Sequence, residues 1–510
     1  MAKEMPDSNG PLNSMEPDWP VAAASMPGGI FDRRHFLGGA ALTGLAAAGA
    51  GLGVGRLARQ QPPQPSAGTA DPKSTDDLHG MAGPQGPGND SHKYYLNVYD
   101  FGARGNGRAD DTAAIQRALD AAAKKGGIVA APSGSYLIKS HLTIPSGVTL
   151  EGVARATARP HWRPPAVPHL QGTTLLAVGG AGNPDGEPFI TIRENGTLKG
   201  VTIFYPEQVP MSSDDPKAQV VPYPWTARGG APDGIGQNVS ILDVLMINPY
   251  QAVDLGTYPC ARHWINGLLG QPLRTGVFID QCGDVGRLEN VHFWGFGASA
   301  YDRFTLGATA FRIGRTDWQY MFNTFAWGYD IGYHFVKTPH GCCNGNFLGV
   351  GADGSGRAAV VVEDSQFPGL LITNGEFTAF QNPNSPGTIQ IEPGNHGPVC
   401  LQNCSFWGAS NHVGTLRGQG PVSFEGCTFA TWDRHNRGDP ALLLDGAPTT
   451  VSGCVFNKVG SGTVAARITP HCPSALIVGN RRVGKDFIVQ RPTRLSSKRF
   501  RIGMNVATEE

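Results

Sequence analysis

The chain carries little charge and no excess of either sign. Asp, Glu, Lys and Arg make up 16% of its 510 residues, and the basic and acidic groups number 41 each. Without a basic field to attract phosphates, we expect no nucleic-acid partner. Hydrophobic residues still reach 40%, which is enough to build a core and excludes a disordered chain of low hydrophobicity.

The composition also argues against long helices and against a fold held together by disulfide bonds. Glycine and proline, at 70 and 40 residues, far exceed average usage and break regular helices, so the composition favours a β-rich domain with many tight turns. The nine cysteines are odd in number and show no paired C-x-x-C spacing, which argues against a disulfide framework and against a zinc site. We expect no metal site, and most of these thiols should be buried as small hydrophobic groups.

The N-terminal segment resembles a twin-arginine export signal. Arg33 and Arg34 are followed, after one residue, by Phe36 and Leu37 and by a weakly apolar, glycine-rich run. The resemblance implies that residues 1–55 are a signal peptide that the twin-arginine export machinery recognises, and that the protein is periplasmic or extracellular. If the signal is not cleaved, the same run would anchor the chain in the membrane, although its glycines disfavour a spanning helix.

A folded domain is predicted to begin after a linker. Residues 56–93 are rich in Pro, Gly, Ser and Asp, which is typical of a disordered linker. Asp110, Asp111 and Thr112 then offer side-chain acceptors for the first amides of a helix. Apolar residues follow at helical spacing and stop before a glycine pair: Ile115, Ala118, Leu119 and Ala122, then Gly126 and Gly127. We therefore predict one amphipathic helix here, with both aspartates in structural roles, followed by short strands.

The same stretch resembles a known family. Residues 97–152, including VYDFGARGNGRADDTAAIQRALDAAAKKGGIVAAPSGSYLI, are similar to the opening of pectate-lyase-superfamily proteins, the group that includes rhamnogalacturonases, polygalacturonases and phage tailspikes. The resemblance implies an all-β fold, a right-handed single-stranded parallel β-helix (a pectin-lyase-like solenoid) with an N-terminal capping helix. We expect it to span residues 94–483, with residues 484–510 as a C-terminal cap or tail.

A repeat in the sequence agrees with a solenoid. Triplets of apolar or small residues recur along the chain, and from Gly375 onward their middle members lie 23 to 29 residues apart, the length of one coil. Earlier gaps of 43 and 47 residues indicate either an unrecognised coil or long excursions. Cys404, Cys427 and Cys454 hold the same place in successive triplets, so we expect them to stack inside the solenoid.

Aromatic residues mark a candidate saccharide-binding surface. Tryptophan and tyrosine rings suit the apolar face of a sugar and leave polar edges for its hydroxyl groups. Such residues are dense between positions 292 and 335, and another lies in a proline-rich excursion at 205–236. The predicted substrate-binding residues are Trp294, Trp318, Trp327, Tyr329 and Trp225. Phe293, Phe322, Phe325 and Phe335 are instead expected in the core.

Three carboxylates in this region are candidate catalytic groups. Glycoside hydrolysis generally needs one carboxylic acid and one carboxylate. Asp317 and Asp330 each lie beside aromatic residues, and Glu376 follows on a later coil. The residues also allow plain surface or turn roles, and sequence does not supply the separation that decides between inversion and retention.

The active-site motifs of polygalacturonases are incomplete in this chain. The nearest pieces are Asn323-Thr324-Phe325, Asp214-Asp215, His340-Gly341 and Arg467-Ile468-Thr469, so no catalytic role is carried over from that family. Calcium-dependent lyases of the family need acidic ligands, and Asp280 and Asp284 could supply oxygen atoms, although turn caps explain them as well.

The sequence thus predicts an exported carbohydrate-active enzyme that degrades a polysaccharide. A glycoside hydrolase with a carboxylate acid/base pair and no cofactor is the first hypothesis. A uronate polysaccharide lyase, which could require Ca²⁺, is the alternative, together with a non-catalytic carbohydrate-binding or cell-envelope β-helix protein.

Overall fold

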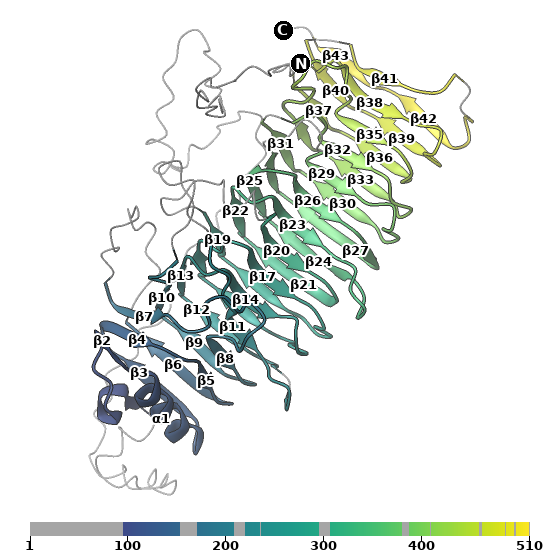
Figure 1. Cartoon of the computed structure of the whole chain (residues 1–510). Helices are drawn as coiled ribbons and strands as arrows, with labels where there is room; N and C mark the ends of the chain where they lie inside the picture. The colour runs from purple at the N-terminus through teal and green to yellow at the C-terminus, as the bar shows by residue number, and fades with distance from the viewer. Residues whose placement is uncertain are drawn as a thin grey trace, which may run out of the picture. The chain divides into compact units, whose positions relative to one another are not determined.

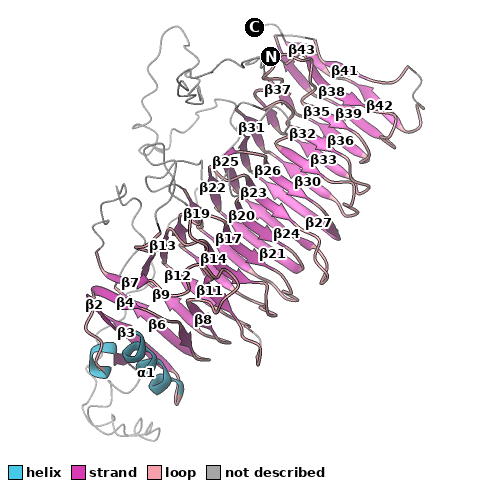
Figure 2. Ribbon diagram, viewed as in Figure 1, coloured by secondary structure: helices cyan, strands magenta, loops and turns pink. Residues whose placement is uncertain are grey.

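Parallel strands make up nearly all the regular structure of the computed structural model (Figures 1 and 2). The structure describes residues 95–153, 171–208, 220–234, 236–294, 307–379, 387–408, 410–457, 462–484, 486–493 and 496–508. Arg33, Arg34 and the rest of the predicted signal and linker lie outside these residues, as do Asp214 and Asp215. No helix within the described ranges is long and apolar enough to cross a membrane.

Three sheets run side by side along the solenoid, and each complete coil contributes one strand to each sheet. We name them sheets A, B and C. Sheet A contains β1 (Tyr95–Asn97), β3 (Gly127–Ala131), β6 (Val148–Gly152), β9 (Thr197–Lys199), β12 (Ser240–Leu242), β15 (Trp264–Asn266), β18 (Arg287–Glu289), β21 (Thr316–Phe322), β24 (Cys343–Leu348), β27 (Ser365–Thr373), β30 (Val399–Gln402), β33 (Val422–Glu425), β36 (Thr449–Ser452), β39 (Ala475–Val478) and β42 (Phe500–Gly503).

Sheet B contains β2 (Asn106–Asp110), β4 (Gly134–Ile138), β7 (Thr173–Ala177), β10 (Thr202–Phe204), β13 (Leu245–Ile247), β16 (Leu269–Gly270), β19 (His292–Phe293), β22 (Phe325–Trp327), β25 (Gly351–Ser355), β28 (Glu376–Ala379), β31 (Ser405–Trp407), β34 (Thr428–Phe429), β37 (Val455–Phe456), β40 (Arg481–Val483) and β43 (Val506–Thr508).

Sheet C contains β5 (Leu142–Ile144), β8 (Ile190–Ile192), β11 (Trp225–Gly229), β14 (Gln251–Leu255), β17 (Thr275–Ile279), β20 (Thr309–Ile313), β23 (Ile331–Phe335), β26 (Ala358–Val362), β29 (Ile389–Ile391), β32 (Gly414–Leu416), β35 (Leu442–Leu444), β38 (Val464–Ile468) and β41 (Ile488–Gln490). The predicted right-handed parallel β-helix is confirmed, with about 13 turns.

The predicted helix is confirmed at the N-terminal end. Helix α1 (Thr112–Ala123) follows a short 3-10 helix, η4 (Val98–Phe101), and its apolar face is buried against β3, β5 and β6 (Figure 1). Asp110 Oδ1 accepts the Thr112 amide at 3.0 Å. Asp111 Oδ1 accepts the Arg104 amide at 2.7 Å and its Oδ2 accepts the Gly105 amide at 3.1 Å. Both carboxylates therefore stabilise the entry to the solenoid, as expected of structural residues.

The apolar triplets line the interior in register. Leu198 pairs with Ile241, Ile241 with Ile265 and Ile265 with Leu288, and all four are buried. The 43-residue gap is an excursion, because β10 pairs directly with β13. The 47-residue gap contains an additional coil, formed by β15, β16 and β17.

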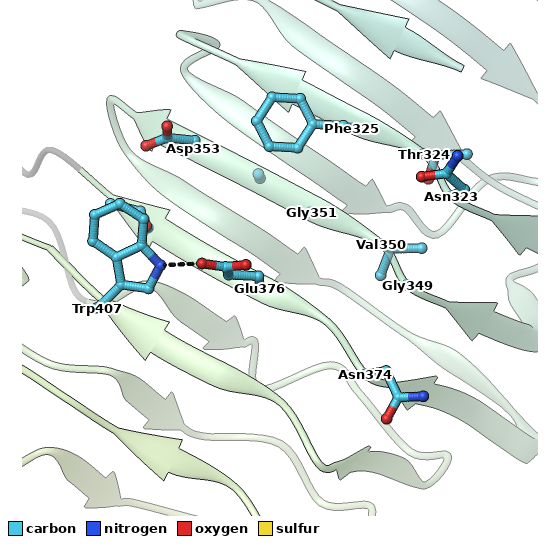
Figure 3. Close-up of a pocket in the computed structure, with 12 residues that line it drawn as sticks. Asn323, Thr324, Phe325, Gly349, Val350, Gly351, Asp353, Asn374, Glu376 and Trp407 are labelled. Carbon is cyan, nitrogen blue, oxygen red and sulfur yellow. Dashed lines mark hydrogen bonds between the residues drawn. The ribbon is translucent and has the colours of Figure 1, made fainter. Parts of the chain in front are cut away.

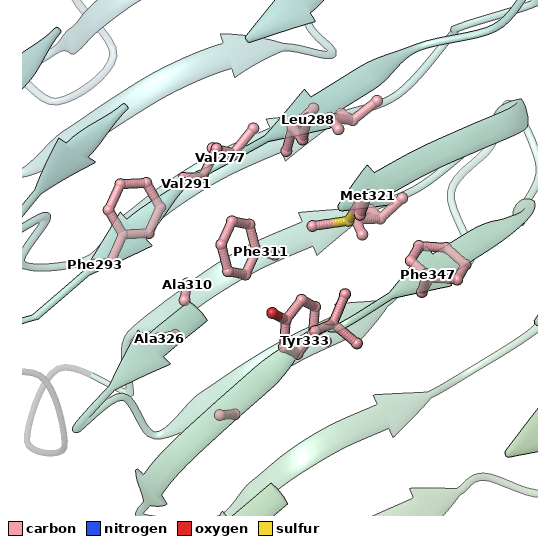
Figure 4. Close-up of a cluster of buried hydrophobic side chains, with 14 of the residues drawn as sticks. Val277, Leu288, Val291, Phe293, Ala310, Phe311, Met321, Ala326, Tyr333 and Phe347 are labelled. Atoms are coloured by element: carbon pink, nitrogen blue, oxygen red, sulfur yellow. The ribbon is translucent and has the colours of Figure 1, made fainter. Parts of the chain in front are cut away.

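Aromatic rings stack inside the coils. Phe293 packs on Phe311 at a ring-centroid distance of 5.4 Å, and Phe311 packs on Tyr333 at 4.8 Å (Figure 4). Cys404, Cys427 and Cys454 are buried in the same interior, as predicted, at 2%, 0% and 1% exposure. This packing leaves only the outward side chains and the loops for binding.

The parallel ladder continues past residue 483. Strand β41 pairs with β38, β42 with β39 and β43 with β40. The described residues near the C-terminus thus add strands to all three sheets.

Candidate functional site

A groove lies on the outer face of sheet B. In this sheet Glu376 pairs with Gly351, and Gly351 pairs with Phe325. Because side chains alternate along a strand, the residues two positions further on, Trp327 and Asp353, point to the same side. Glu376 and Trp327, both predicted as site residues, therefore share one face.

The groove has a volume of about 320 Å³ and is centred on β25 and β28 (Figure 3). Its lining combines amides, two carboxylates, a phenyl ring and an indole. The lining residues are Asn323, Thr324, Phe325, Gly349, Val350, Gly351, Ala352, Asp353, Asn374, Glu376, Thr378 and Trp407.

Glu376 is held by the indole of Trp407. Trp407 Nε1 donates to Glu376 Oε1 at 2.8 Å (Figure 3). Trp407 lies on β31, on the side of Glu376 that faces away from β25. The bond therefore draws the Glu376 carboxylate away from Asp353, which lies on β25.

Asp353 and Glu376 are diagonal neighbours on adjacent strands. Asp353 comes two residues after Gly351, the partner of Glu376. With about 4.8 Å between strands and about 3.3 Å rise per residue, their Cα atoms lie roughly 8 Å apart. Both side chains line the same groove, so one bound molecule can contact both carboxyl groups.

Gly351 keeps the floor of the groove open. A Cβ at this position would lie 2.9 Å from Phe325 Cδ2, closer than real side-chain contacts allow. The absence of a side chain between Phe325 and Glu376 therefore creates the space beside the ring.

Aromatic rings extend this surface toward the N-terminal coils. The His292 ring lies 4.4 Å from the Trp294 ring and 4.9 Å from the Phe325 ring, measured between centroids. Burial lowers the pKa of His292, which favours its neutral form near neutral pH. Trp294, predicted to bind substrate, thus lies on the same face as Glu376.

Asp330 lies at the turn from sheet B into sheet C. Burial raises the pKa of this carboxyl, while Arg357 and Arg274 oppose the shift. Arg357 Nε is 3.8 Å from Asp330 Oδ2. Asp330 therefore lies beside two arginines at the edge of sheet C, whereas Glu376 lies in the groove on sheet B.

A second polar cluster covers the outer face of sheet C near Asp330. His334 Nε2 lies 2.9 Å from Glu363 Oε1. Burial lowers the pKa of His334, Glu363 opposes this effect, and Arg357 and Arg312 add to it. The cluster combines a largely neutral imidazole, two carboxyl groups and two guanidinium groups.

Trp225 also lies on sheet C. Its ring stacks on Phe278 at 6.3 Å and 22°, and the Arg312 guanidinium lies 4.9 Å from the centre of the Phe278 ring. Trp225 thus lies on the same sheet as the His334 cluster and not on sheet B, which carries the groove.

Asp317 and Trp318 lie on sheet A. Asp317 Oδ1 accepts hydrogen bonds from Arg315 and, at 3.0 Å, from Gln366 Nε2. The ring of Trp318 is 61% exposed. The structure therefore does not bring Asp317 together with Asp330 or Glu376 as one catalytic set.

Tyr329 does not reach any surface in the described structure. It is fully buried, and its hydroxyl donates to the Pro272 carbonyl at 2.8 Å. The expectation for the phenylalanines was right for Phe293 and Phe335, which are buried, and wrong for Phe322 and Phe325. Phe322 is 49% exposed and Phe325 lines the groove, because both lie at outward positions of their strands.

Sequence reasoning gave no binding role to Trp407 and His292, and no catalytic role to Asp353. The sequence feature that could have identified these residues is the repeat itself. Side chains alternate along a strand, so a residue directly before or after an inward-pointing aromatic residue or alanine must point outward. Glu376 precedes Phe377, Trp407 follows Phe406 and Asp353 follows Ala352.

The proposed calcium ligands fit a metal poorly. Asp280 Oδ1 accepts the Arg315 amide at 2.6 Å and the Thr338 hydroxyl at 3.0 Å, and Asp284 pairs with Arg262 at 3.0 Å. Within the described part of the chain, no group of three or more His, Cys, Asp or Glu side chains could hold a metal ion. These two aspartates serve turns and ion pairs.

Comparisons with known proteins agree with the fold. A family model described as rhamnogalacturonase A/epimerase, pectate lyase-like, matches residues 95–160. The A-module of mannuronan C-5 epimerase AlgE6 from Azotobacter vinelandii has a similar structure, with a TM-score of 0.51 and 17% identity, over 81% of this chain and 99% of that one. Fold and family match together define a right-handed parallel β-helix with a pectate-lyase-like opening.

Curated relatives match over short stretches. Alginate lyase 7 of Azotobacter vinelandii is 60% identical over 43 residues, which are 8% of this chain and 5% of that protein. Mannuronan C5-epimerase AlgE3 of the same organism is 50% identical over 65 residues, 11% of this chain and 4% of that protein. The chain therefore spans only a small part of the length of these relatives.

Proposed function

We propose that the chain is a carbohydrate-active enzyme that hydrolyses a polysaccharide lying across the outer face of sheet B. The observation that carries this proposal is the placement of Asp353 and Glu376 on one face of neighbouring strands, in a groove bordered by Phe325 and Trp407. Paired carboxyl groups beside aromatic rings are what glycoside hydrolysis and sugar binding require.

The two carboxyl groups take different roles. Glu376, whose carboxylate accepts the Trp407 indole N–H, is assigned as the base that activates water. Asp353 is the acid that protonates the leaving oxygen. Their Cα atoms lie roughly 8 Å apart, and the distance between the two carboxyl groups in the bound state decides between inversion and retention.

The saccharide runs parallel to the solenoid axis. Trp294 follows β19, Phe325 and Trp327 lie on the adjacent strand β22, and Trp407 lies on β31 of the same sheet, so a chain along the axis meets rings at both ends of the groove. The names of the relatives, which refer to alginate and mannuronan, support testing acidic polysaccharides first.

A uronate lyase or epimerase activity is the second candidate, and the cluster on sheet C favours it. There, Arg312 and Arg357 could neutralise a carboxylate, and neutral His334, paired with Glu363, could take a proton from the adjacent carbon. A non-catalytic carbohydrate-binding protein would need only the aromatic face.

The test is incubation of the purified protein with a panel of acidic and neutral polysaccharides, with and without EDTA. New reducing ends without ultraviolet absorbance support hydrolysis, and abolition by Glu376→Gln but not by His334→Gln assigns it to sheet B. Unsaturated products that are lost with His334→Gln, or with EDTA, would replace hydrolysis by elimination. Retention of a polysaccharide without any product would make the protein a binder.

We further propose that the protein acts outside the cytoplasm. Support comes from Arg33, Arg34 and the apolar run that follows them, and from the pattern of residues 56–93, which suits a linker between a signal and the solenoid.

A further inference from the structure

Sheet A carries an exposed apolar platform at three adjacent coils. On β21, Trp318, Tyr320 and Phe322 alternate with buried residues and are 61%, 42% and 49% exposed. Leu348, on the next strand, pairs with Phe322 and is 41% exposed. Leu371 and Phe367 on β27 are 41% and 91% exposed.

The platform coincides with a local lengthening of the sheet. Strands β21, β24 and β27 have 7, 6 and 9 residues, whereas β15 and β18 have 3 each. The hydrogen bond from Gln366 Nε2 to Asp317 Oδ1, at 3.0 Å, connects the residues that precede Phe367 and Trp318. This hydrogen bond therefore joins the two strand segments that carry the most exposed rings, Trp318 and Phe367.

Trp318 is held outward in a strained conformation. Its φ is +57°, a value that bulky residues rarely adopt. Such a backbone is unfavourable for a bulky residue and persists where surrounding contacts enforce it. Here Asn344 Oδ1 accepts the Trp318 amide at 3.0 Å, while Gln319 and Met321 are buried beneath.

The exposed area approaches that of a protein interface. Aromatic side chains have about 150–250 Å² each, so the exposed fractions of the four aromatic residues alone sum to roughly 500 Å². This is at the upper end of the largest patch on an ordinary monomer, about 300–600 Å². It is also close to the roughly 800 Å² that each partner contributes to a standard interface.

The charges beside the platform are self-complementary. Arg287 and Glu289 lie two residues apart on β18, where Arg287 pairs with Tyr320 and Glu289 with Phe322. A two-fold axis parallel to the solenoid, midway between these columns, exchanges the two positions. It would place Arg287 of one copy opposite Glu289 of the other, and Tyr320 opposite Phe322.

We propose that two copies of this chain associate face to face through the sheet A platform about such a two-fold axis. Closed two-fold contacts use the same patch on both subunits. The aromatic side chains form the centre of the interface, and the two Arg287–Glu289 pairs fix its register at the border.

The test is the solution mass of the full-length protein, measured by sedimentation over a wide range of concentrations. The wild type should reach twice the monomer mass. Arg287→Glu alone and Glu289→Arg alone should each weaken association by about tenfold or more, because each places like charges opposite one another. The double exchange, Arg287→Glu with Glu289→Arg, should restore association.

Controls separate the platform from general effects of surface change. Tyr95→Ala removes an exposed aromatic residue from the first strand of the same sheet and should leave the mass unchanged, and circular dichroism checks the fold of each variant. A wild type that stays monomeric at every concentration overturns the proposal. So does a double exchange that fails to restore a dimer lost in the single variants. Weaker polysaccharide retention by Trp318→Ala, in a monomeric protein, would assign the platform to carbohydrate instead.

Discussion

Replacing Phe429 by alanine should destabilise the C-terminal coils by about 4 kcal/mol. The ring is fully buried and lies between Phe406, at 5.3 Å and 24°, and Phe456, at 4.4 Å and 9°. Loss of a buried phenylalanine costs about 3–5 kcal/mol, and stacked rings contribute about 0.5–1.5 kcal/mol beyond their area. Because each coil packs only on its neighbours, the cost should fall on the coils around β34.

Native-state hydrogen exchange of the β33, β34 and β36 amides measures this local free energy. Val153→Ala, at a side chain that is 63% exposed, is the control and should change stability by less than about 0.5 kcal/mol. A loss of less than about 1 kcal/mol for Phe429→Ala, or equal losses in distant N-terminal coils, would refute the stacked-core reasoning.

Two further predictions concern acid stability and export. Burial alone would raise the pKa of the Asp364 carboxyl, but hydrogen bonds from Lys337 and from the His396 and Ser365 amides outweigh burial and lower the pKa in the folded protein. The stabilisation by the ionised carboxylate is therefore present above the pKa of the unfolded chain and is lost as the pH falls through the pKa of the folded protein. Asp364→Asn should therefore cost about 1–3 kcal/mol at neutral pH and less once the pH falls through the lowered pKa of the folded protein, as read from urea midpoints; a constant difference across pH would contradict this. Replacing Arg33 and Arg34 together by lysine should leave the protein in the cytoplasm, and unchanged recovery outside it would show that the arginine pair is incidental.

The interior of the solenoid could be predicted from sequence because it repeats. Residues such as Leu198, Ile241 and Leu288 must be apolar, since each coil buries its inner surface on the next. In one coil the repeat was lost because polar residues replaced apolar ones. In the coil that holds Ile477, the other two interior positions are Asn480 and Arg482.

These two polar residues make contacts that no local pattern reveals. Asn480 Oδ1 accepts the Cys454 amide at 3.0 Å, and the Arg482 guanidinium lies 4.4 Å from the centre of the Trp432 ring. A search for apolar triplets alone therefore misses the coil that contains β39 and β40.

The candidate site was harder to predict, because a high density of aromatic and acidic residues along the sequence does not say on which of the three sheets each residue lies. Asp317, Asp330 and Glu376 lie within 60 positions of one another, yet they belong to sheet A, the turn into sheet C, and sheet B. Register decides the face, and a shift of one residue moves a side chain between core and surface. Tyr329 is the clearest example, since it lies two residues after Trp327 but points inward.

The central claim is that Asp353 and Glu376 cut a polysaccharide on sheet B, and turnover of matched variants tests it most directly. On whichever polysaccharide is cleaved, Asp353→Asn and Glu376→Gln should each lose at least about 100-fold in kcat. Asp317→Asn and Glu425→Gln, on sheet A, should retain nearly full turnover. Full activity in Glu376→Gln or Asp353→Asn, with loss in Asp317→Asn, would contradict the account.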